Sequence, residues 1–184
     1  QNMNNLLIFH SPDRRTNMNA SDALEMLLRS YRQYYDIERE NVTPPFAAEA
    51  AFHSHQSQYF LVRRATIGES ESHEYVFFAT PERLDLDTAK QLDETAWETG
   101  MSRVEPHRDH RNTDVSLLIL ADVIEPNVRS YLRRLHRSKS YGHMLQGWSN
   151  YRVVAIELSS GRLTSNRLGR DLKKLFRNIQ KSNS

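Results

Sequence analysis

Two histidines and two aspartates lie within the eight positions 107–114, directly before the most apolar segment of the chain. They are His107, Asp109, His110 and Asp114. In an extended segment His107 and Asp109 point the same way, whereas in a helical turn His107 and His110 do. Hydrolytic zinc, manganese or iron sites use imidazole and carboxylate ligands, at least three of them, with one open position. One hypothesis is therefore a divalent-metal site that activates water for a hydrolase or nuclease reaction.

A solvated loop that leads into a buried strand is the alternative interpretation of the same segment. The spacing of its histidines and aspartates matches no metal motif with a defined mechanism. Arg108 and Arg111 would also place positive charge against a bound cation. The sequence therefore favours the loop, and we expect no cofactor, with a divalent metal as the alternative.

A second group of imidazoles consists of His53, His55 and His73. If their segments pair as a hairpin, these side chains could bind zinc or respond together to pH. Surface strands also carry such residues without any special role, and the register that would bring them together does not follow from the sequence.

Charge is divided unevenly along this chain, whose net charge is +2. Residues 1–126 hold 12 Lys and Arg against 21 Asp and Glu, whereas residues 127–184 hold 13 against 2. The two parts can attract each other within one molecule or across a dimer. The basic part can instead contact an anionic partner.

The cations of the last segment recur at steps of three and four opposite a stripe of leucines, which predicts a positive helix face. A second basic run begins near residue 129. The predicted anion-binding residues are Arg170, Lys173, Lys174, Arg177, Lys181, Arg133 and Arg137. An acidic protein or a nucleic acid fits such a face, although no recognised nucleic-acid-binding signature accompanies it.

Several kinds of catalytic site lack their sequence motif in this chain. The absence of cysteine excludes disulfides, cysteine-ligated zinc and cysteine nucleophiles. Phosphate-binding glycine loops, the serine-hydrolase elbow and the zincin motif are also missing. One type of nuclease core has an acidic residue two positions before a lysine on a strand. In this chain only Asp171 and Lys173 have that spacing, and they fall on a predicted helix.

Hydrophobic periodicity predicts the elements that position these residues. Val115–Val123 lacks alternation and is expected to be a central strand, buried on both faces. Strands at 59–62 and 74–79 are expected to form an antiparallel pair. Helices are predicted at about 22–38, from Asp85 to Gly100, after Pro126 and after Asn166, and further strands at 141–145, 152–158 and 162–164.

This order predicts an α+β fold with a mixed, mostly antiparallel sheet covered by helices and a long helix near each end. Residues 1–20 are expected to be a flexible arm and residues 21–184 a single domain. No apolar run approaches the roughly 20 residues of a membrane helix, and no secretory signal is apparent. We therefore expect a cytoplasmic protein that does not associate with membranes.

Short motifs are spread along the chain: Ser72-His-Glu-Tyr-Val-Phe-Phe78, Pro106 with His110, Lys139-Ser-Tyr141, Gly147-Trp148, Leu158, Thr164-Ser-Asn166 and Gly169. Together, over about residues 58–180, they resemble a family of uncharacterised bacterial proteins. The resemblance implies one intact domain in a bacterial cytosolic protein. It implies no activity and no catalytic residue.

The sequence thus favours a non-enzymatic binding or assembly domain, a homodimer, whose basic C-terminal face contacts an acidic partner or its own acidic part. The uneven charge and the missing catalytic motifs support this prediction. The metal-assisted hydrolase or nuclease at residues 107–114 is the alternative, so whether the protein is an enzyme stays open at this stage.

Overall fold

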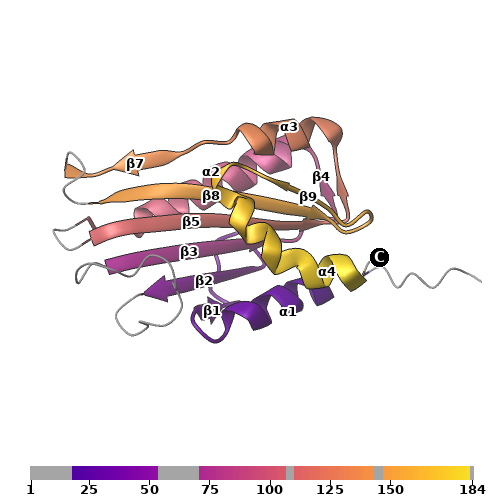
Figure 1. Cartoon of the computed structure of the whole chain (residues 1–184), viewed down its shortest axis with the longest axis horizontal. Helices are drawn as coiled ribbons and strands as arrows, with labels where there is room; N and C mark the ends of the chain where they lie inside the picture. The colour runs from indigo at the N-terminus through magenta and orange to yellow at the C-terminus, as the bar shows by residue number, and fades with distance from the viewer. Residues whose placement is uncertain (1–17, 54–70, 107–109, 143–146, 183–184) are drawn as a thin grey trace, which may run out of the picture.

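The centre of the sheet consists of long strands with apolar runs, as expected for strands that are buried on both faces. The computed structural model describes the residues 18–53, 71–106, 110–142 and 147–182. The three central strands are parallel to one another and are β3 (Glu71–Ala79), β5 (His110–Ala121) and β8 (Trp148–Glu157). β5 lies between the other two, which confirms the predicted central strand, although it ends at Ala121 (Figure 1).

Shorter strands continue the sheet on both sides of these three. β2 (Ala48–His53) and β1 (Asp36–Glu38) extend it beyond β3, whereas β7 (Ser138–Ser140) and β9 (Arg162–Ser165) both pair with β8. All of these added pairings are antiparallel, so the predicted α+β class with a mixed, mostly antiparallel sheet is confirmed. A separate small sheet pairs β4 (Arg83–Leu84) with β6 (Val123–Ile124).

Side chains alternate along the central strands, so each face of the sheet has its own apolar layer. On one face, Phe77, Leu117 and Val153 pack beneath α2 (Leu86–Ser102) and α3 (Pro126–Arg134). The Asp85 carboxylate caps α2 by accepting from the N–H of Thr88 at 2.7 Å, as its residue type predicts. The predicted stop at Gly100 is wrong, because α2 continues to Ser102. Instead, Gly100 makes room for Val115, whose methyl groups lie 2.7 Å from where a Cβ would stand.

The other face carries the helices from the two ends of the described chain. Phe78, Leu118 and Val154 pack there beneath three helices, which lie in front of the sheet in Figure 1. They are α1 (Ala20–Tyr31), the 3-10 helix η3 (Leu168–Phe176) and α4 (Arg177–Ser182). Among the described helices, none has the length and apolar character needed to cross a membrane.

The first helix is shorter than its pattern of apolar residues predicts. α1 ends at Tyr31, and Tyr35 lies outside it. The Tyr35 ring packs against Phe52, and its hydroxyl donates to the Glu74 carboxylate. Tyr35 follows Tyr31 at helical spacing, but its position is set by contacts with the sheet and not by another helical turn.

The strand predictions also need correction. The segment 59–62 lies outside the described residues, and the antiparallel partner of β3 is β2, which the sequence did not predict. β2 is rich in alanine, a residue with weak strand propensity. The strand expected at 141–145 is wrong for Tyr141 and Gly142, because β7 lies just before them.

Asn166 fills the edge of β8 between β7 and β9. Its Oδ1 accepts from the backbone N–H of Val153 at 3.0 Å and of Gly169 at 2.8 Å. Its Nδ2 donates to the carbonyl oxygens of Tyr151 at 2.9 Å and of Leu135 at 3.2 Å. Both donors and both acceptor positions of the amide are therefore used. Asn166 directly precedes Arg167, the N-cap residue of η3, and bridges β8, the segment after α3, and η3.

We expect Asn166→Ala to lower the free energy of unfolding by about 2–4 kcal/mol, because it leaves several buried backbone groups without a partner. Urea denaturation of the purified variant measures this. Asn41→Ala, at an exposed position, is the matched control and should change stability by less than about 0.5 kcal/mol. Equal stability of the two variants would contradict the bridging role.

Candidate functional site

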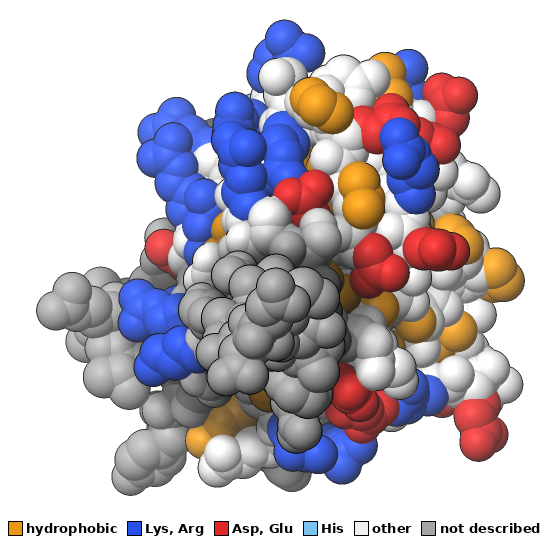
Figure 2. Space-filling view, turned by 90° about the vertical axis from the view of Figure 1, so that its right-hand side faces the viewer, with side chains coloured by type: hydrophobic (Ala, Val, Ile, Leu, Met, Phe, Trp, Pro, Cys, Tyr) orange, Lys and Arg blue, Asp and Glu red, His pale blue; other side chains and the backbone are white. Residues whose placement is uncertain are grey.

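The last two helices carry a shallow groove of about 290 Å³ that is lined mainly by cations. We call it the η3–α4 groove. Its lining consists of Leu163, Arg170, Asp171, Lys173, Lys174, Arg177 and Gln180. Figure 2 views the end of the molecule where α4 ends, and several lysine and arginine side chains gather at its upper left, on the side of these helices.

The winding of η3 explains why these cations lie together. A 3-10 helix has three residues per turn and rises about 2 Å per residue, so residues three apart form rows with a spacing of about 6 Å. Arg170 and Lys173 lie in one row, while Lys174 and Arg177 are separated by the same step. The opposite side of the segment is buried through Leu172, Phe176 and Ile179, as the sequence predicts. Leu168 is an exception, since it is 38% exposed.

No ion pair within the described part of the chain involves the four lining cations. The nearest acid in sequence, Asp171, forms no salt bridge with them there either. Arginines of the same basic segment that do form ion pairs lie elsewhere: Arg129 binds Glu157, Arg137 binds Asp93, and Arg152 binds Glu74 and Asp114. The groove therefore carries positive charge that the described fold does not neutralise.

The three other predicted anion-binding residues do not line this groove. Lys181 is exposed farther along α4. Arg133 is exposed on α3, in the helix layer on the opposite face of the sheet. Arg137 follows α3 and is already bound to a carboxylate of α2. The predicted set is thus divided between the groove and three other places.

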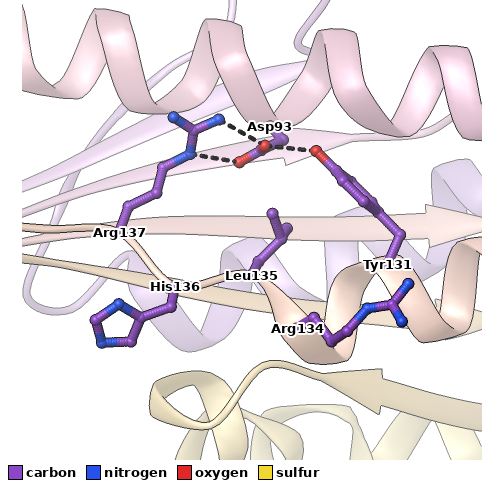
Figure 3. Close-up of a pocket in the computed structure, with 6 residues that line it drawn as sticks. All are labelled: Asp93, Tyr131, Arg134, Leu135, His136 and Arg137. Atoms are coloured by element: carbon purple, nitrogen blue, oxygen red, sulfur yellow. Dashed lines mark hydrogen bonds and ion pairs between the residues drawn. The ribbon is translucent and has the colours of Figure 1, made fainter.

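Arg137 belongs to a second pocket, of about 380 Å³, which Figure 3 shows. Its Nε and Nη2 lie 3.1 and 2.7 Å from the two carboxylate oxygens of Asp93, which is 1% exposed. The Tyr131 hydroxyl also donates to Asp93, at 2.7 Å. Burial raises the pKa of Tyr131, and the Asp93 carboxylate raises it further, so this hydroxyl stays a donor. These bonds join α2 to the segment around α3, which favours a structural role.

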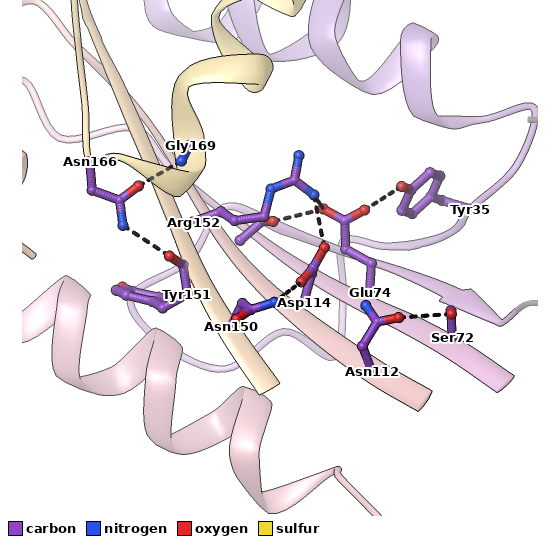
Figure 4. Close-up of polar contacts among 11 residues, drawn as sticks. Tyr35, Ser72, Glu74, Asn112, Asp114, Asn150, Tyr151, Arg152, Asn166 and Gly169 are labelled. Atoms are coloured by element: carbon purple, nitrogen blue, oxygen red, sulfur yellow. Dashed lines mark hydrogen bonds and ion pairs between the residues drawn. The ribbon is translucent and has the colours of Figure 1, made fainter. Parts of the chain in front are cut away.

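A third polar group lies on the sheet face beneath α1 and η3. This face is apolar at Phe78, Leu118 and Val154, but toward the amino ends of the same strands it becomes polar. We call the polar part the strand-end network. Its residues come from β3, β5 and β8, together with one tyrosine that follows α1, and are Tyr35, Ser72, Glu74, Asn112, Asp114, Ser116, Asn150 and Arg152 (Figure 4).

Arg152 is the centre of this network and lies between two carboxylates. Its Nη1 is 3.2 Å from Glu74 Oε1 and 3.4 Å from Asp114 Oδ2. The hydroxyls of Tyr35 and Ser116 donate to Glu74 at 2.6 and 2.7 Å. Burial raises the pKa of Tyr35, and the charge of Glu74 raises it further. For Arg152, burial lowers the pKa, but the two carboxylates outweigh this effect and the net shift is upward.

The structure describes only part of the predicted metal site. Asp114 lies in the strand-end network, where its Oδ1 accepts from Asn150 at 3.3 Å. His107, Asp109 and the side chain of His110 lie outside the described residues. Among the side chains that are described, no group of three or more His, Asp or Glu could hold a metal ion.

The second histidine group is partly assembled by the antiparallel pairing of β2 with β3. The register places His53 directly opposite His73. His55 lies outside the described residues, as does the side chain of His53. The register therefore places the backbones of two of the three histidines side by side.

Sequence reasoning missed the strand-end network, although one signal for it is visible. Glu74 directly precedes the apolar run of β3, and Arg152 directly precedes the run Val153–Ile156 of β8. A charge on a strand covered on both faces needs a partner. Their pairing depends on the order and register of β3, β5 and β8, which periodicity along one strand cannot reveal.

We expect Arg137→Leu to lower the free energy of unfolding by about 2–4 kcal/mol, because Asp93 would stay buried without its countercharge. The lower end of this range is favoured, since the Arg137 side chain is 34% exposed. Thermal and urea denaturation measure the effect. Arg133→Leu, which removes an exposed arginine from the same region, serves as the control. An equal loss of unfolding free energy in both variants would argue against a specific role for the Arg137–Asp93 ion pair.

Comparison with known proteins gives one family and no activity. No curated protein and no solved structure matches the chain. The sequence model of one family matches residues 19–178, from the residue that caps α1 to the first turn of α4, and so begins well before residue 58. The resemblance to an uncharacterised family is confirmed. The chain belongs to the family described as Domain of unknown function (DUF8052).

Proposed function

We propose that this protein is a non-enzymatic binding domain that holds an acidic protein segment in the η3–α4 groove. One observation carries the proposal: Arg170, Lys173, Lys174 and Arg177 line one groove and form no ion pair with the described residues. Four cations face a single carboxylate there, that of Asp171. An acidic partner would supply the missing countercharge.

The exposure of these cations favours an extended partner over a single small anion. Arg170, Lys174 and Arg177 are exposed, and Lys173 is half-buried. An exposed ion pair contributes only about 0.2–1 kcal/mol, so useful affinity needs several contacts at once. A peptide with repeated carboxylates can make them along both rows of the groove.

The lining favours an acidic protein over a nucleic acid. Single-stranded nucleic acids bind through a positive groove combined with aromatic side chains on which the bases stack. None of the described residues that line the groove is aromatic. The Asp171 carboxylate would also repel a continuous phosphate backbone more strongly than it would repel spaced carboxylates.

A second copy of the chain can also supply carboxylates. Asp22 is exposed on α1, in the helix layer that also holds the groove, whereas Asp87, Glu94 and Glu98 are exposed on α2 in the opposite layer. In a two-fold dimer residue i contacts residue j and j contacts i, so acids beside the groove can face the partner's groove, while those of α2 can do so only head to tail. The expected homodimer is therefore a second candidate for the acidic partner.

The double variant Arg170→Glu/Lys174→Glu tests the groove. We expect the unmodified protein to bind a fluorescently labelled poly-glutamate peptide at about 50 mM salt and to lose affinity as salt screens the contacts. The double variant should bind at least about tenfold more weakly, because two favourable contacts become repulsive. Fluorescence anisotropy titrations provide the affinities.

The matched control is Arg133→Glu/Arg134→Glu, which changes the net charge equally but lies on α3. It should keep most of the affinity. Absence of peptide binding at low salt, or equal losses in both double variants, would overturn the proposal. Tighter binding of a single-stranded DNA of similar charge would identify nucleic acid as the partner instead.

A further inference from the structure

The strand-end network places charged groups where the rest of the central strands is apolar. The side chains of Glu74, Arg152 and Asp114 are 14%, 18% and 23% exposed. Apolar residues of similar size are often as stabilising as a largely buried ion pair, so such a pair is weak evidence for a purely structural role. Polar groups at this depth are common where a ligand binds.

Several hydrogen-bonding groups of this network are unused by the described residues. Arg152 makes all of its contacts there through Nη1, which leaves Nε and Nη2 as donors. Asn112 accepts from Ser72 through Oδ1, so its Nδ2 remains a donor. Asn150 donates through Nδ2, so its Oδ1 remains an acceptor. Asn112 and Asn150 are half-buried, and the Arg152 side chain keeps 18% of its surface exposed, so all three residues reach solvent.

An exposed aromatic ring lies at the end of this row of groups. Trp148 begins β8, is 36% exposed, and is the register partner of Asn112, so the two side chains lie on the same face. Along β8, the side chains of Trp148, Asn150 and Arg152 follow one another on that face. Because each residue adds about 3.3 Å, the row spans about 13 Å.

The charge of the network separates its ligand from that of the η3–α4 groove. Among the described residues of this network, two carboxylates, Glu74 and Asp114, face one guanidinium, that of Arg152, and this balance disfavours an anion. The unused groups include both donors and an acceptor in planar side chains beside an indole. Sugar hydroxyls both donate and accept, and the C–H face of a sugar ring packs well on an aromatic ring.

We propose that the strand-end network is a binding site for a neutral carbohydrate. The sugar ring at one end of the ligand stacks on the indole of Trp148. Asn112 and Asn150 form hydrogen bonds with its hydroxyl groups. Arg152 donates a hydrogen bond to an oxygen at the other end of the ligand. The span of the row suits a short oligosaccharide better than a single sugar. This site is separate from the groove, and the inference does not rest on the proposed acidic partner.

Fluorescence of Trp148 provides a direct test, because the chain has only one other tryptophan, Trp97. In a Trp97→Phe background, maltotriose, cellotriose and tri-N-acetylchitotriose are titrated separately up to about 10 mM, which detects millimolar affinity. We expect a saturable change in emission with at least one of them. Asn150→Ala should weaken that binding at least about fivefold, because the acceptor of one hydroxyl is lost.

Isothermal calorimetry of Trp148→Ala in the full chain, with the sugar that responds, completes the test. Removal of this exposed ring should abolish binding while urea denaturation stays nearly unchanged. The groove variant Arg170→Glu/Lys174→Glu should bind the sugar normally, and Trp148→Ala should bind poly-glutamate normally. No saturable response to any of the three sugars, or unchanged binding by Trp148→Ala, would overturn the inference. Saturable binding of spermidine, a polycation, with no binding of the sugars would show that the ligand is not neutral and would overturn the inference.

Discussion

The side-chain amide of Asn166 is the contact on which the edge of this fold depends. β7 and β9 pair with the two ends of β8, and the backbone of Tyr151 and Val153 between them is completed by Asn166. The same amide binds Leu135, which follows α3, and Gly169, the second residue of η3. Elements from both faces of the sheet therefore meet at one buried residue. Substitution of either the donor or the acceptor half would leave backbone groups without partners.

Gly169 is the second residue that determines how η3 packs against the edge of β8. A Cβ at this position would stand 2.3 Å from the carbonyl oxygen of Val153, so only glycine allows η3 to begin directly against β8. From that point the buried side of the helix, through Leu172 and Phe176, follows the apolar half of the sheet face. Its cations are consequently turned outward, and this orientation produces the η3–α4 groove. The strand-end network lies toward the other end of the same strands.

The uneven charge of the chain is resolved in two different ways. Arg137 and Arg152, from the basic part, are neutralised by Asp93, Glu74 and Asp114, from the acidic part. These contacts are largely buried and join elements of one molecule, as the internal interpretation of the charge pattern expects. The cations of η3 and α4 receive no such partner among the described residues, because the inner side of these helices is occupied by apolar packing. Internal attraction and an available cationic surface therefore coexist.

Residue type and local spacing by themselves determined the capped start of α2 at Asp85, the start of α3 at Pro126, the buried strand β5 and the basic side of the last helices. Each of these depends on neighbours within one or two turns of the chain. Tertiary structure decided which charges are paired, since Glu74 and Arg152 meet only through the order and register of three strands. A slip of one residue would turn these side chains to opposite faces. It also decided the place of β2 and of Tyr35, because contacts with the sheet outweighed weak local preferences.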